Sequence, residues 1–322
     1  MKSAVLAACA ALMIPAISSF AQAPAPKAPA APKTPAAAKA PAAPKPLPVV
    51  TPDDAAKLEA LVGSALSAKP ATARKVLVFS KTEGFVHGDG IVYGIKALEL
   101  AAKTGAFQAD FTTDYAAIND KANLSKYDAV VLNNTTALKT KANPSFVPNL
   151  IEFVKSGHGL CVIHSGADNF YDAPDAAEMV GGQFGGHPWG GGGTNKLFSG
   201  WAFKLDDPSS PLNKSFEGKN FKAADEIYQQ KSPPYDRSKL HVLVSLDLSD
   251  ETTAKSNVEK QKRTDKDYAV SWIRSFGEGR VFYTSFAHDK RAYMDKARLT
   301  HILAGLQYTL GDLKADDKPA AK

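Results

Sequence analysis

The sequence has only two cysteines among its 322 residues, and this scarcity excludes a fold that depends on disulfide bonds. Cys9 lies in an N-terminal segment that we expect to be removed, so Cys161 would be left without a partner in the same chain. Because Cys161 lies in an apolar run, we expect a buried and unreactive thiol. Stability must therefore come from a hydrophobic core, which a domain of roughly 240 residues is large enough to build.

The sequence also lacks a strong excess of charge of one sign. It has 39 lysine and arginine residues against 33 aspartate and glutamate residues, a net charge of +6. Most of that excess lies in residues 1–73, which hold seven lysines and three acidic residues. The remainder has no basic stripe of the kind that nucleic-acid binding requires, so we expect no nucleic-acid partner.

The apolar run near the N-terminus is too short to span a bilayer comfortably, and residues 1–23 have the pattern of a secretory signal peptide. Lys2 is followed by an apolar stretch over residues 4–17 and by the small-residue cleavage pattern Ala21-Gln22-Ala23. We therefore expect a periplasmic or secreted protein. In the alternative interpretation, the segment ending at Cys9 is a lipoprotein signal and Cys9 carries a lipid, although the sequence before Cys9 is very short for that purpose.

Residues 24–50 are almost entirely alanine, proline and lysine, a composition that cannot bury a core and predicts a disordered linker. Its evenly placed lysines would keep it solvated and would allow contact with a cell wall or an anionic membrane surface. We expect one α/β domain over residues 51–312, beginning with a short helix capped by Thr51. Residues 313–322 are expected to form a disordered tail.

From residue 75 onward the pattern alternates between buried strands and amphipathic helices. We expect strands at 76–79, 107–113, 127–132 and 160–164, and helices at 90–104 and 145–155. This order predicts an α/β domain with a mostly parallel sheet and helices on both faces. Nine glycines within residues 181–200 then predict a loop. The remaining elements that we expect are strands at 201–205 and 241–247, a hairpin of 268–274 with 280–285, and a helix at 295–310.

Polar side chains follow the ends of several predicted strands. The carboxyl ends of parallel strands lie at one edge of a sheet, where the ligands of such folds bind, so we expect these side chains to share one rim. The glycine-rich loop and the pair Asp225-Glu226 add further candidates. The candidate site residues are Thr82, Phe85, His87, Asn134, Thr135, His164, Asp168, His187, Trp189, Glu226, His288 and Asp289.

Four of the seven histidines belong to this set, and three interpretations of them are open. A metal site would use two or three of them with Glu226 or Asp289, although no HExxH or similarly tight spacing is present. A nucleophilic triad is disfavoured, because Ser165 lacks a GxSxG context and Cys161 comes too early in its strand. The third interpretation is an acid/base site for a hydroxylated substrate, beside aromatic residues that would either stack on sugar rings or belong to the core.

The same segments carry a resemblance to a known family. The longest matching segments are residues 75–87 (KVLVFSKTEGFVH), 157–168 (GHGLCVIHSGAD) and 279–289 (GRVFYTSFAHD). Shorter matches are residues 127–136, 184–188 and 225–228. Together these motifs make residues 75–310 similar to the ThuA-like, or trehalose-utilisation, family.

The resemblance implies a flavodoxin-like three-layer sandwich related to the class I glutamine amidotransferases. The position of the catalytic cysteine in those enzymes corresponds here to His164, so amidotransferase chemistry is not implied. The family is associated with the breakdown of trehalose and related disaccharides, alongside dehydrogenases that make keto-sugars. This sequence departs from the family pattern at His158, which replaces a glycine, and in the unusually glycine-rich loop after Trp189.

We therefore expect an exported carbohydrate-processing enzyme, a hydrolase, lyase or isomerase, that acts on a glycoside or keto-glycoside by histidine-centred acid/base chemistry. His164 or His288 would be the base, and His87 or His187 the acid or polarising group. Asp289 or Glu226 would orient an imidazole. The residues expected to contact the carbohydrate are Thr82, Phe85, Asn134, Thr135, Asp168 and Trp189. No cofactor is assigned, a divalent metal stays open, and the alternatives are a non-catalytic glycan-binding module and a metal-dependent hydrolase.

Overall fold

The computed structural model describes residues 46–190 and 200–319. The predicted signal peptide, the alternative lipid site at Cys9 and most of the predicted linker lie outside the described residues, as do residues 191–199 of the glycine-rich loop. Residues 46–50, the end of the predicted linker, contain no helix or strand. In the part of the chain that is described, no helix combines the length and the apolar character that a membrane span needs.

The domain alternates between strands and helices in its first half and is mostly strands and short helical turns in its second. The strands are β1 (Lys75–Phe79), β2 (Gln108–Thr112), β3 (Ala129–Asn133), β4 (Gly159–Ile163), β5 (Trp201–Leu205), β6 (Phe221–Ala223), β7 (His241–Leu246), β8 (Ala269–Phe276) and β9 (Gly279–Thr284). The α-helices are α1 (Pro52–Val62), α2 (Gly88–Lys103), α3 (Ala116–Asn119), α4 (Lys121–Leu124), α5 (Phe146–Lys155), α6 (Pro174–Val180), α7 (Glu251–Ala254), α8 (Lys290–Tyr293) and α9 (Lys296–Thr309).

Every strand and long helix that the sequence predicted is present, with ends that differ by at most two residues. The predicted helix cap is also confirmed, since the Thr51 hydroxyl accepts a hydrogen bond from the backbone N–H of Asp54 at 3.2 Å. The sequence did not predict β6 or the short helices. These elements have only three to seven residues, which is too short for a hydrophobic period to show.

The strands form one sheet in the order β2-β1-β3-β4-β9-β8-β7-β5-β6. Pairing is parallel from β2 to β9 and antiparallel from β9 to β6. The prediction of a mostly parallel sheet therefore holds for the first half of the sheet alone. The change occurs at the β8–β9 hairpin, where a turn at Gly277 and Glu278 leaves no room for a crossover and forces an antiparallel pair.

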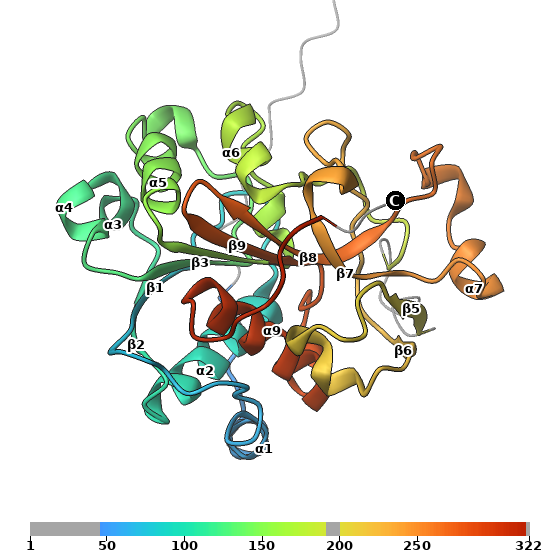
Figure 1. The fold of residues 1–322 in the computed structure, drawn as a ribbon, viewed down its shortest axis with the longest axis horizontal. Coiled ribbons are helices and arrows are strands. Elements are labelled where there is room, and N and C mark those ends of the chain that lie inside the picture. The colour runs from blue at the N-terminus through green and yellow to red at the C-terminus, as the bar shows by residue number, and fades with distance from the viewer. Residues whose placement is uncertain (1–45, 191–199, 320–322) are drawn as a thin grey trace, which may run out of the picture. The chain divides into compact units, whose positions relative to one another are not determined.

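Helices cover the two faces of this sheet, with α5 and α6 on one side and α2 and α9 on the other (Figure 1). Central strands such as β3 and β4 are buried along their whole length and consist mainly of aliphatic residues, as expected for strands covered on both faces. Two hydrophobic clusters result. One packs the aliphatic side chains of α2 and α9 against the sheet, and the other packs those of α5 and α6.

The prediction of a disordered tail does not hold for residues 313–319. Asp317 accepts hydrogen bonds from the hydroxyls of Ser275 and Tyr308, both at 2.7 Å. The carbonyl of Lys318 accepts a hydrogen bond from Nδ1 of His241 at 2.7 Å. Leu313 also packs against the core. Charge and small residues suggested fraying, but these partners come from β7, β8 and α9, which no local pattern could reveal.

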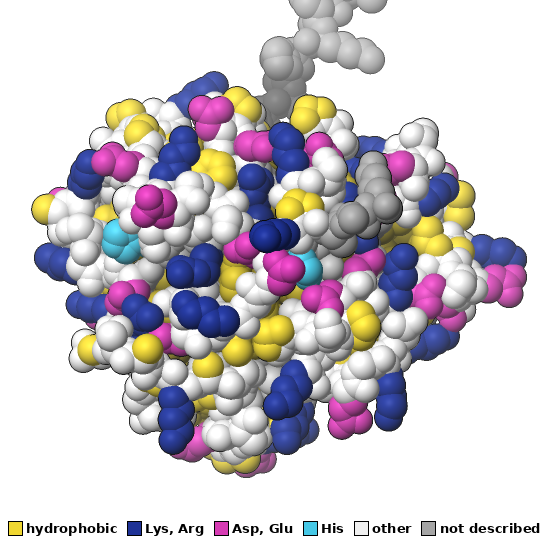
Figure 2. Space-filling model, in the orientation of Figure 1, with side chains coloured by type: hydrophobic (Ala, Val, Ile, Leu, Met, Phe, Trp, Pro, Cys, Tyr) yellow, Lys and Arg dark blue, Asp and Glu magenta, His cyan; other side chains and the backbone are white. Residues whose placement is uncertain are grey.

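The surface carries both signs of charge. On the face shown in Figure 2, basic and acidic side chains are interspersed, and neither sign forms a continuous stripe. Several of the basic groups are paired with acids, among them Lys121 with Glu152 and Lys239 with Glu178. Interspersed charge of this kind gives little long-range attraction for a polyanion.

His301 gives the fold a measurable pH dependence. It lies on α9, is fully buried, and donates from Nδ1 to the carbonyl of Leu212 at 3.0 Å. Burial lowers the pKa of His301 from 6.5 to about 4. The unfolded chain therefore binds a proton near pH 6.5 that the folded protein does not bind until about pH 4. The stabilisation is fully present above pH 6.5 and is lost as the pH falls toward 4.

Urea unfolding of wild type and His301→Gln at pH 7 and pH 4 tests this. Between these values the free energy of unfolding should fall by about 3 kcal/mol more in the wild type, because glutamine does not titrate. Other titrating groups are shared by both proteins and cancel in the comparison. Equal losses of stability in the two proteins would show that His301 is not the source.

Candidate functional site

Four side chains from distant parts of the sequence meet at the carboxyl edge of the parallel strands. His87 follows β1, His164 follows β4, His288 follows β9, and Glu226 follows β6. One nitrogen or carboxylate oxygen from each of the four lies within 4.8 Å of the others. We call these four residues the His/Glu cluster. They converge because β1, β3, β4 and β9 run parallel, so their carboxyl ends share one edge.

The backbone turns sharply where these strands reach the cluster. Asn134, His164 and Ala287 follow the ends of β3, β4 and β9, and their φ angles are 51°, 50° and 82°. Residues other than glycine rarely adopt this left-handed conformation, and such strain concentrates at functional sites. The turn at His164 connects a buried strand to a 3₁₀ helix, so an imidazole occupies the tip of the strand-to-helix elbow.

His164 is held in one orientation and one tautomer. Its Nδ1 donates a hydrogen bond to the carbonyl of Ser285 at 2.7 Å, so the proton of the neutral ring is on Nδ1. Its Nε2 faces the cluster, 3.3 Å from Nδ1 of His288. His164 is fully buried, and Oε1 of Glu226 is a second neighbour of that nitrogen at 3.8 Å.

Glu226 joins the cluster to the surface. Its Oε1 lies 3.3 Å from Nδ1 of His288 and 3.8 Å from Nε2 of His164. Its Oε2 lies 3.8 Å from Nδ1 of His187, whose side chain is 42% exposed. The carboxylate therefore stands between a buried pair of imidazoles and an exposed one. His187 is held there because residues 184 and 189 pair with residues 230 and 227 as isolated β-bridges.

The surroundings of the cluster shift the pKa values of its members in different directions. Burial and the neighbouring His288 lower the pKa of His87 from 6.5 to about 3, and burial lowers the pKa of His164 well below its ordinary value. Burial also opposes the charged form of His288, but the hydrogen bond and charge of Glu226 outweigh it and raise the pKa of His288. The same pairing lowers the pKa of Glu226 although its burial acts in the opposite direction.

A buried ion pair supports the strand end that carries His288. The carboxylate of Asp225 accepts the backbone N–H groups of Ala287 at 3.0 Å and His288 at 3.2 Å. Its charge is balanced by Arg298 of α9, with Nη1 at 3.4 Å. Sequence reasoning gave Asp225 no role. The available signals were its place beside Glu226 and in the matching segment 225–228, since its partners come from parts of the chain about 60 to 70 residues away.

Aromatic side chains form one wall of the site, and the sequence did not single out the most important of them. The ring of Tyr228 lies 4.5 Å from those of His164 and Phe184, measured between centroids. Its hydroxyl is 3.4 Å from Nε2 of His87. Tyr228 is buried, and the hints in the sequence were its place two residues beyond Glu226 and at the end of the matching segment 225–228.

Predicted binding residues line the rim around the cluster. Phe85 is 66% exposed, and its ring meets that of His87 edge-on at 4.8 Å. The segments of Thr82 and Asp168 are joined through β-bridges to Thr136. Asp168 accepts a hydrogen bond from Tyr171, which is 51% exposed. Burial raises the pKa of Asp168.

Asn134 lies deeper than these rim residues. Its side-chain amide donates to the carbonyl of Ala287 at 3.3 Å, and its buried Oδ1 has no hydrogen-bond partner among the described residues. Asn134 therefore connects the end of β3 with the end of β9, beside His288.

Three predicted site residues have structural roles instead. Trp189 is fully buried against Tyr268 and donates to the carbonyl of Thr253, so the prediction that it contacts a sugar is wrong. Thr135 is also fully buried and accepts a hydrogen bond from Asn169, which rules out the predicted contact with substrate. Asp289 caps α8 and pairs with Arg291, and of the two carboxylates predicted as alternatives to orient an imidazole it is Glu226 that lies beside His288. Of the three, Asp289 directly follows a cluster residue in the sequence, whereas Trp189 and Thr135 adjoin none.

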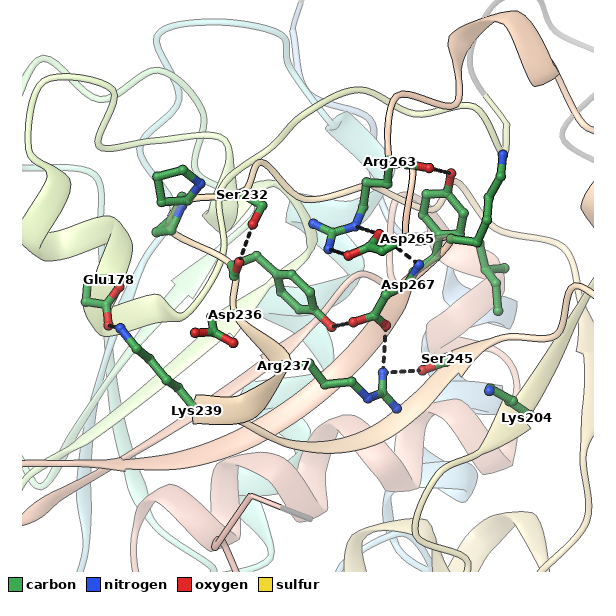
Figure 3. Close-up of a pocket in the computed structure, with 16 residues that line it drawn as sticks. Glu178, Lys204, Ser232, Asp236, Arg237, Lys239, Ser245, Arg263, Asp265 and Asp267 are labelled. Carbon is green, nitrogen blue, oxygen red and sulfur yellow. Dashed lines mark hydrogen bonds and ion pairs between the residues drawn. The ribbon is translucent and has the colours of Figure 1, made fainter. Parts of the chain in front are cut away.

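A cavity of about 680 Å³ lies elsewhere on the domain, and none of the predicted site residues lines it. Several of the charged groups that line it pair with one another (Figure 3). Arg263 pairs with Asp265, Lys239 pairs with Glu178, and Arg237 bonds to both Asp267 and Ser245. The chemistry-bearing residues therefore lie at the strand ends and not in this cavity.

Gly90 sets the distance between α2 and the strand end that carries His288. A Cβ at this position would lie 2.7 Å from the carbonyl oxygen of Ala287 and 2.9 Å from that of His288. We expect Gly90→Ala to push this segment away and to destabilise the fold by about 1 to 3 kcal/mol in a urea titration.

Gly63→Ala is the matched control, because a Cβ there would meet no atom closer than 3.5 Å and the backbone at Gly63 is right-handed helical. It should leave stability unchanged or raise it by up to about 1 kcal/mol. Similar effects of the two substitutions would contradict the tight contact at Gly90.

Comparisons with known proteins identify the family and the fold of this chain. The ThuA family, described as trehalose utilisation, matches residues 75–309. A solved structure of a protein described as ThuA-like, from Bacteroides uniformis ATCC 8492, is 21% identical, with a TM-score of 0.58 over 78% of this chain and 98% of that chain. A second, from Parabacteroides merdae ATCC 43184, is 17% identical, with a TM-score of 0.53 over 76% of this chain and 93% of that chain.

At these identities the two solved structures show a shared fold and nothing more. A comparison with curated proteins finds no match. The family match, by contrast, spans most of the chain, including all the parallel strands and α9. This chain therefore belongs to the ThuA family, whose description is trehalose utilisation.

Proposed function

We propose that this protein is an exported carbohydrate-processing enzyme that acts on a glycoside or keto-glycoside by histidine-centred acid/base chemistry. The observation that carries the proposal is the His/Glu cluster, in which three imidazoles and a carboxylate meet at the edge where ligands of parallel sheets bind. Imidazole is the side chain best suited to proton transfer near neutral pH, and carboxylates orient it.

The rim of the site supports a carbohydrate as the substrate. Phe85 and Tyr171 are exposed aromatic residues of the kind that stack on the apolar faces of sugar rings. Asp168, which accepts a hydrogen bond from Tyr171, is a carboxylate that can also accept hydrogen bonds from sugar hydroxyls. The family description points to the same class of substrate.

The geometry favours a division of roles that differs from the one the sequence suggested. His187 is exposed and lies beside Glu226, so it is the imidazole best placed to exchange a proton with a bound sugar and with water. His87 and His164 are buried and the side chain of His288 is 16% exposed, which suits these three to polarise a carbonyl or hydroxyl oxygen. Removal of a proton next to a sugar carbonyl needs one group of each kind.

Neither Cys161 nor Ser165 is placed to act as a catalytic nucleophile. We infer that the layered arrangement is flavodoxin-like, with His164 at the elbow where related enzymes place a cysteine. Burial raises the pKa of the Cys161 thiol far above neutral, and Cys161 lies inside β4. The hydroxyl of Ser165 is fully buried and has no hydrogen-bond partner among the described residues, hence no base to activate it.

Export is a separate part of the proposal. It rests on the signal-peptide pattern of residues 1–23 and on the alanine, proline and lysine composition of the segment that follows. We propose a periplasmic or secreted protein whose linker contacts a cell wall or an anionic surface. Fractionation of cells that express the full chain, with the N-terminus of the product sequenced, tests this. Cleavage after Ala23 supports the proposal, and an intact N-terminus in the cytoplasmic fraction contradicts it.

Replacement of His187 tests the catalytic proposal. In a screen of trehalose, related disaccharides and their keto derivatives, we expect His187→Asn to lower kcat by about 10² to 10⁴, because a proton-transfer group is lost. His158→Asn is the matched control, since His158 is also partly exposed but stacks on Phe153 away from the site. Sugar binding without product formation in the wild type would identify a glycan-binding module and refute the enzyme.

Replacement of Phe85 tests the sugar platform. Phe85→Ala should raise KM by roughly 2- to 12-fold and leave kcat unchanged, because a stacking contact is lost equally from the ground state and the transition state. Phe111→Ala is the control, since Phe111 is an exposed aromatic residue on the edge strand β2. Equal KM values for the two variants would remove Phe85 from the binding site.

A further inference from the structure

We infer that His87, His164, Glu226 and His288 bind a divalent first-row transition-metal ion. Four potential ligand atoms, three nitrogens and one oxygen, lie within 4.8 Å of one another in a largely buried site. The inference goes beyond the proposed function, because metal binding does not require the turnover of any sugar. No short sequence motif predicted this metal site, because its four ligands come from four separate segments of the chain.

The spacing of the ligand atoms fits a metal centre. Two ligands bound tetrahedrally at the usual zinc–nitrogen distance lie about 3.3 Å apart. Nδ1 of His288 is 3.3 Å from Nε2 of His164 and 3.3 Å from Oε1 of Glu226. The third edge of this triangle, from Nε2 of His164 to Oε1 of Glu226, is 3.8 Å. A small closure of that edge would place all three atoms around one ion.

The cluster has more hydrogen-bond acceptors than protons to satisfy them, which favours a bound cation. The proton on Nδ1 of His164 is used by the carbonyl of Ser285, so Nε2 presents a lone pair. Glu226 presents a carboxylate oxygen to the same point. The single Nδ1 of His288 faces both of these acceptors and can donate one proton to them. One metal ion would satisfy all three atoms, whereas one proton satisfies them incompletely.

His87 supplies a second and independent observation. It is 5% exposed, and its Nδ1 has no hydrogen-bond partner among the described residues. A buried ring nitrogen without a partner is costly, so such groups call for an explanation. The ring of His87 lies edge-on to those of His164 and His288, with centroids 4.8 and 5.0 Å apart. An ion bound among these three rings would account for the burial of His87 beside them.

The groups behind the ligands are arranged as they are in metal sites. A ligating histidine typically donates its other ring N–H to a carbonyl or carboxylate, which orients the ring. His164 does so to the carbonyl of Ser285. Asp225 holds the backbone of His288 through two N–H groups and is itself paired with Arg298. These contacts position the ligands before any ion binds.

The donor set indicates which metals would bind. Imidazole suits zinc, iron, nickel and copper, whereas magnesium and calcium prefer sites made of oxygen alone. Three nitrogens and one carboxylate oxygen therefore favour zinc or a neighbouring transition metal. If the proposed function is correct, the ion would polarise the sugar oxygen, and His187 would remain outside the cluster to move the proton.

The test uses the full chain, purified without a histidine tag, stripped with chelator and titrated with zinc(II). We expect one equivalent of zinc per chain by elemental analysis and a rise in Tm when zinc is added. Glu226→Gln and His288→Gln should bind zinc at least about tenfold more weakly, because each removes a ligand. His241→Gln, which changes a histidine of β7 bonded to Asp207, should bind zinc like the wild type.

Absence of a zinc equivalent in the wild type, or unchanged affinity in both cluster variants, would overturn the inference. If the variants fail to fold, cobalt(II) in the wild type decides. Intense visible bands of four- or five-coordinate cobalt support the site, and the weak spectrum of hydrated cobalt overturns it. None of these readouts involves sugar turnover. A protein that binds zinc but converts no sugar would refute the proposed function and leave the metal site standing.

Discussion

The hydrogen bond from Nδ1 of His164 to the carbonyl of Ser285 ties together the ends of β4 and β9. It acts at the one place where the parallel half of the sheet meets the antiparallel half. Because the Nδ1 proton is used in this hydrogen bond, Nε2 presents its lone pair to His288 and Glu226. The register of two neighbouring strands and the chemistry of the site therefore depend on the same contact. A shift of either strand by one residue would turn its side chains to the other face and remove the site.

Strained backbone and buried polar groups at the site cost folding free energy, which the packing of the surrounding structure offsets. Asn134, His164 and Ala287 adopt left-handed backbone conformations at three neighbouring strand ends. Several polar groups of the cluster are withdrawn from water, and the ion pair of Asp225 with Arg298 is buried beneath them. Such an arrangement persists because the flanking strands are continuous aliphatic segments and α9 packs tightly across them. The packed strands and α9 thus support a sheet edge that has strained backbone and buried polar groups.

The sequence predicted the elements well and the site in part, for a physical reason. A strand buried on both faces is recognisable from its own residues, so β1, β3 and β4 could be placed, and the histidines after β1, β4 and β9 followed from the rule for parallel sheets. Trp189, Thr135 and Asp289 were assigned to the site because they lie in the glycine-rich loop or follow the ends of predicted strands. Their side chains point elsewhere, into the core or to Arg291. Asp225 and Tyr228 were overlooked because their contacts are long-range.

The sequence by itself determined the α/β class, the order of strands and helices, the likeness to the ThuA family and the set of histidines at strand ends. These properties depend on local hydrophobic period, turn residues and short motifs, which neighbouring residues specify. Only the tertiary structure decided that β7, β5 and β6 extend the sheet beyond the predicted hairpin, that residues 313–319 pack on the domain, and that Glu226 joins three histidines. Each of these outcomes depends on contacts between residues far apart in the chain, where the balance of burial, charge and hydrogen bonding is set by the whole fold.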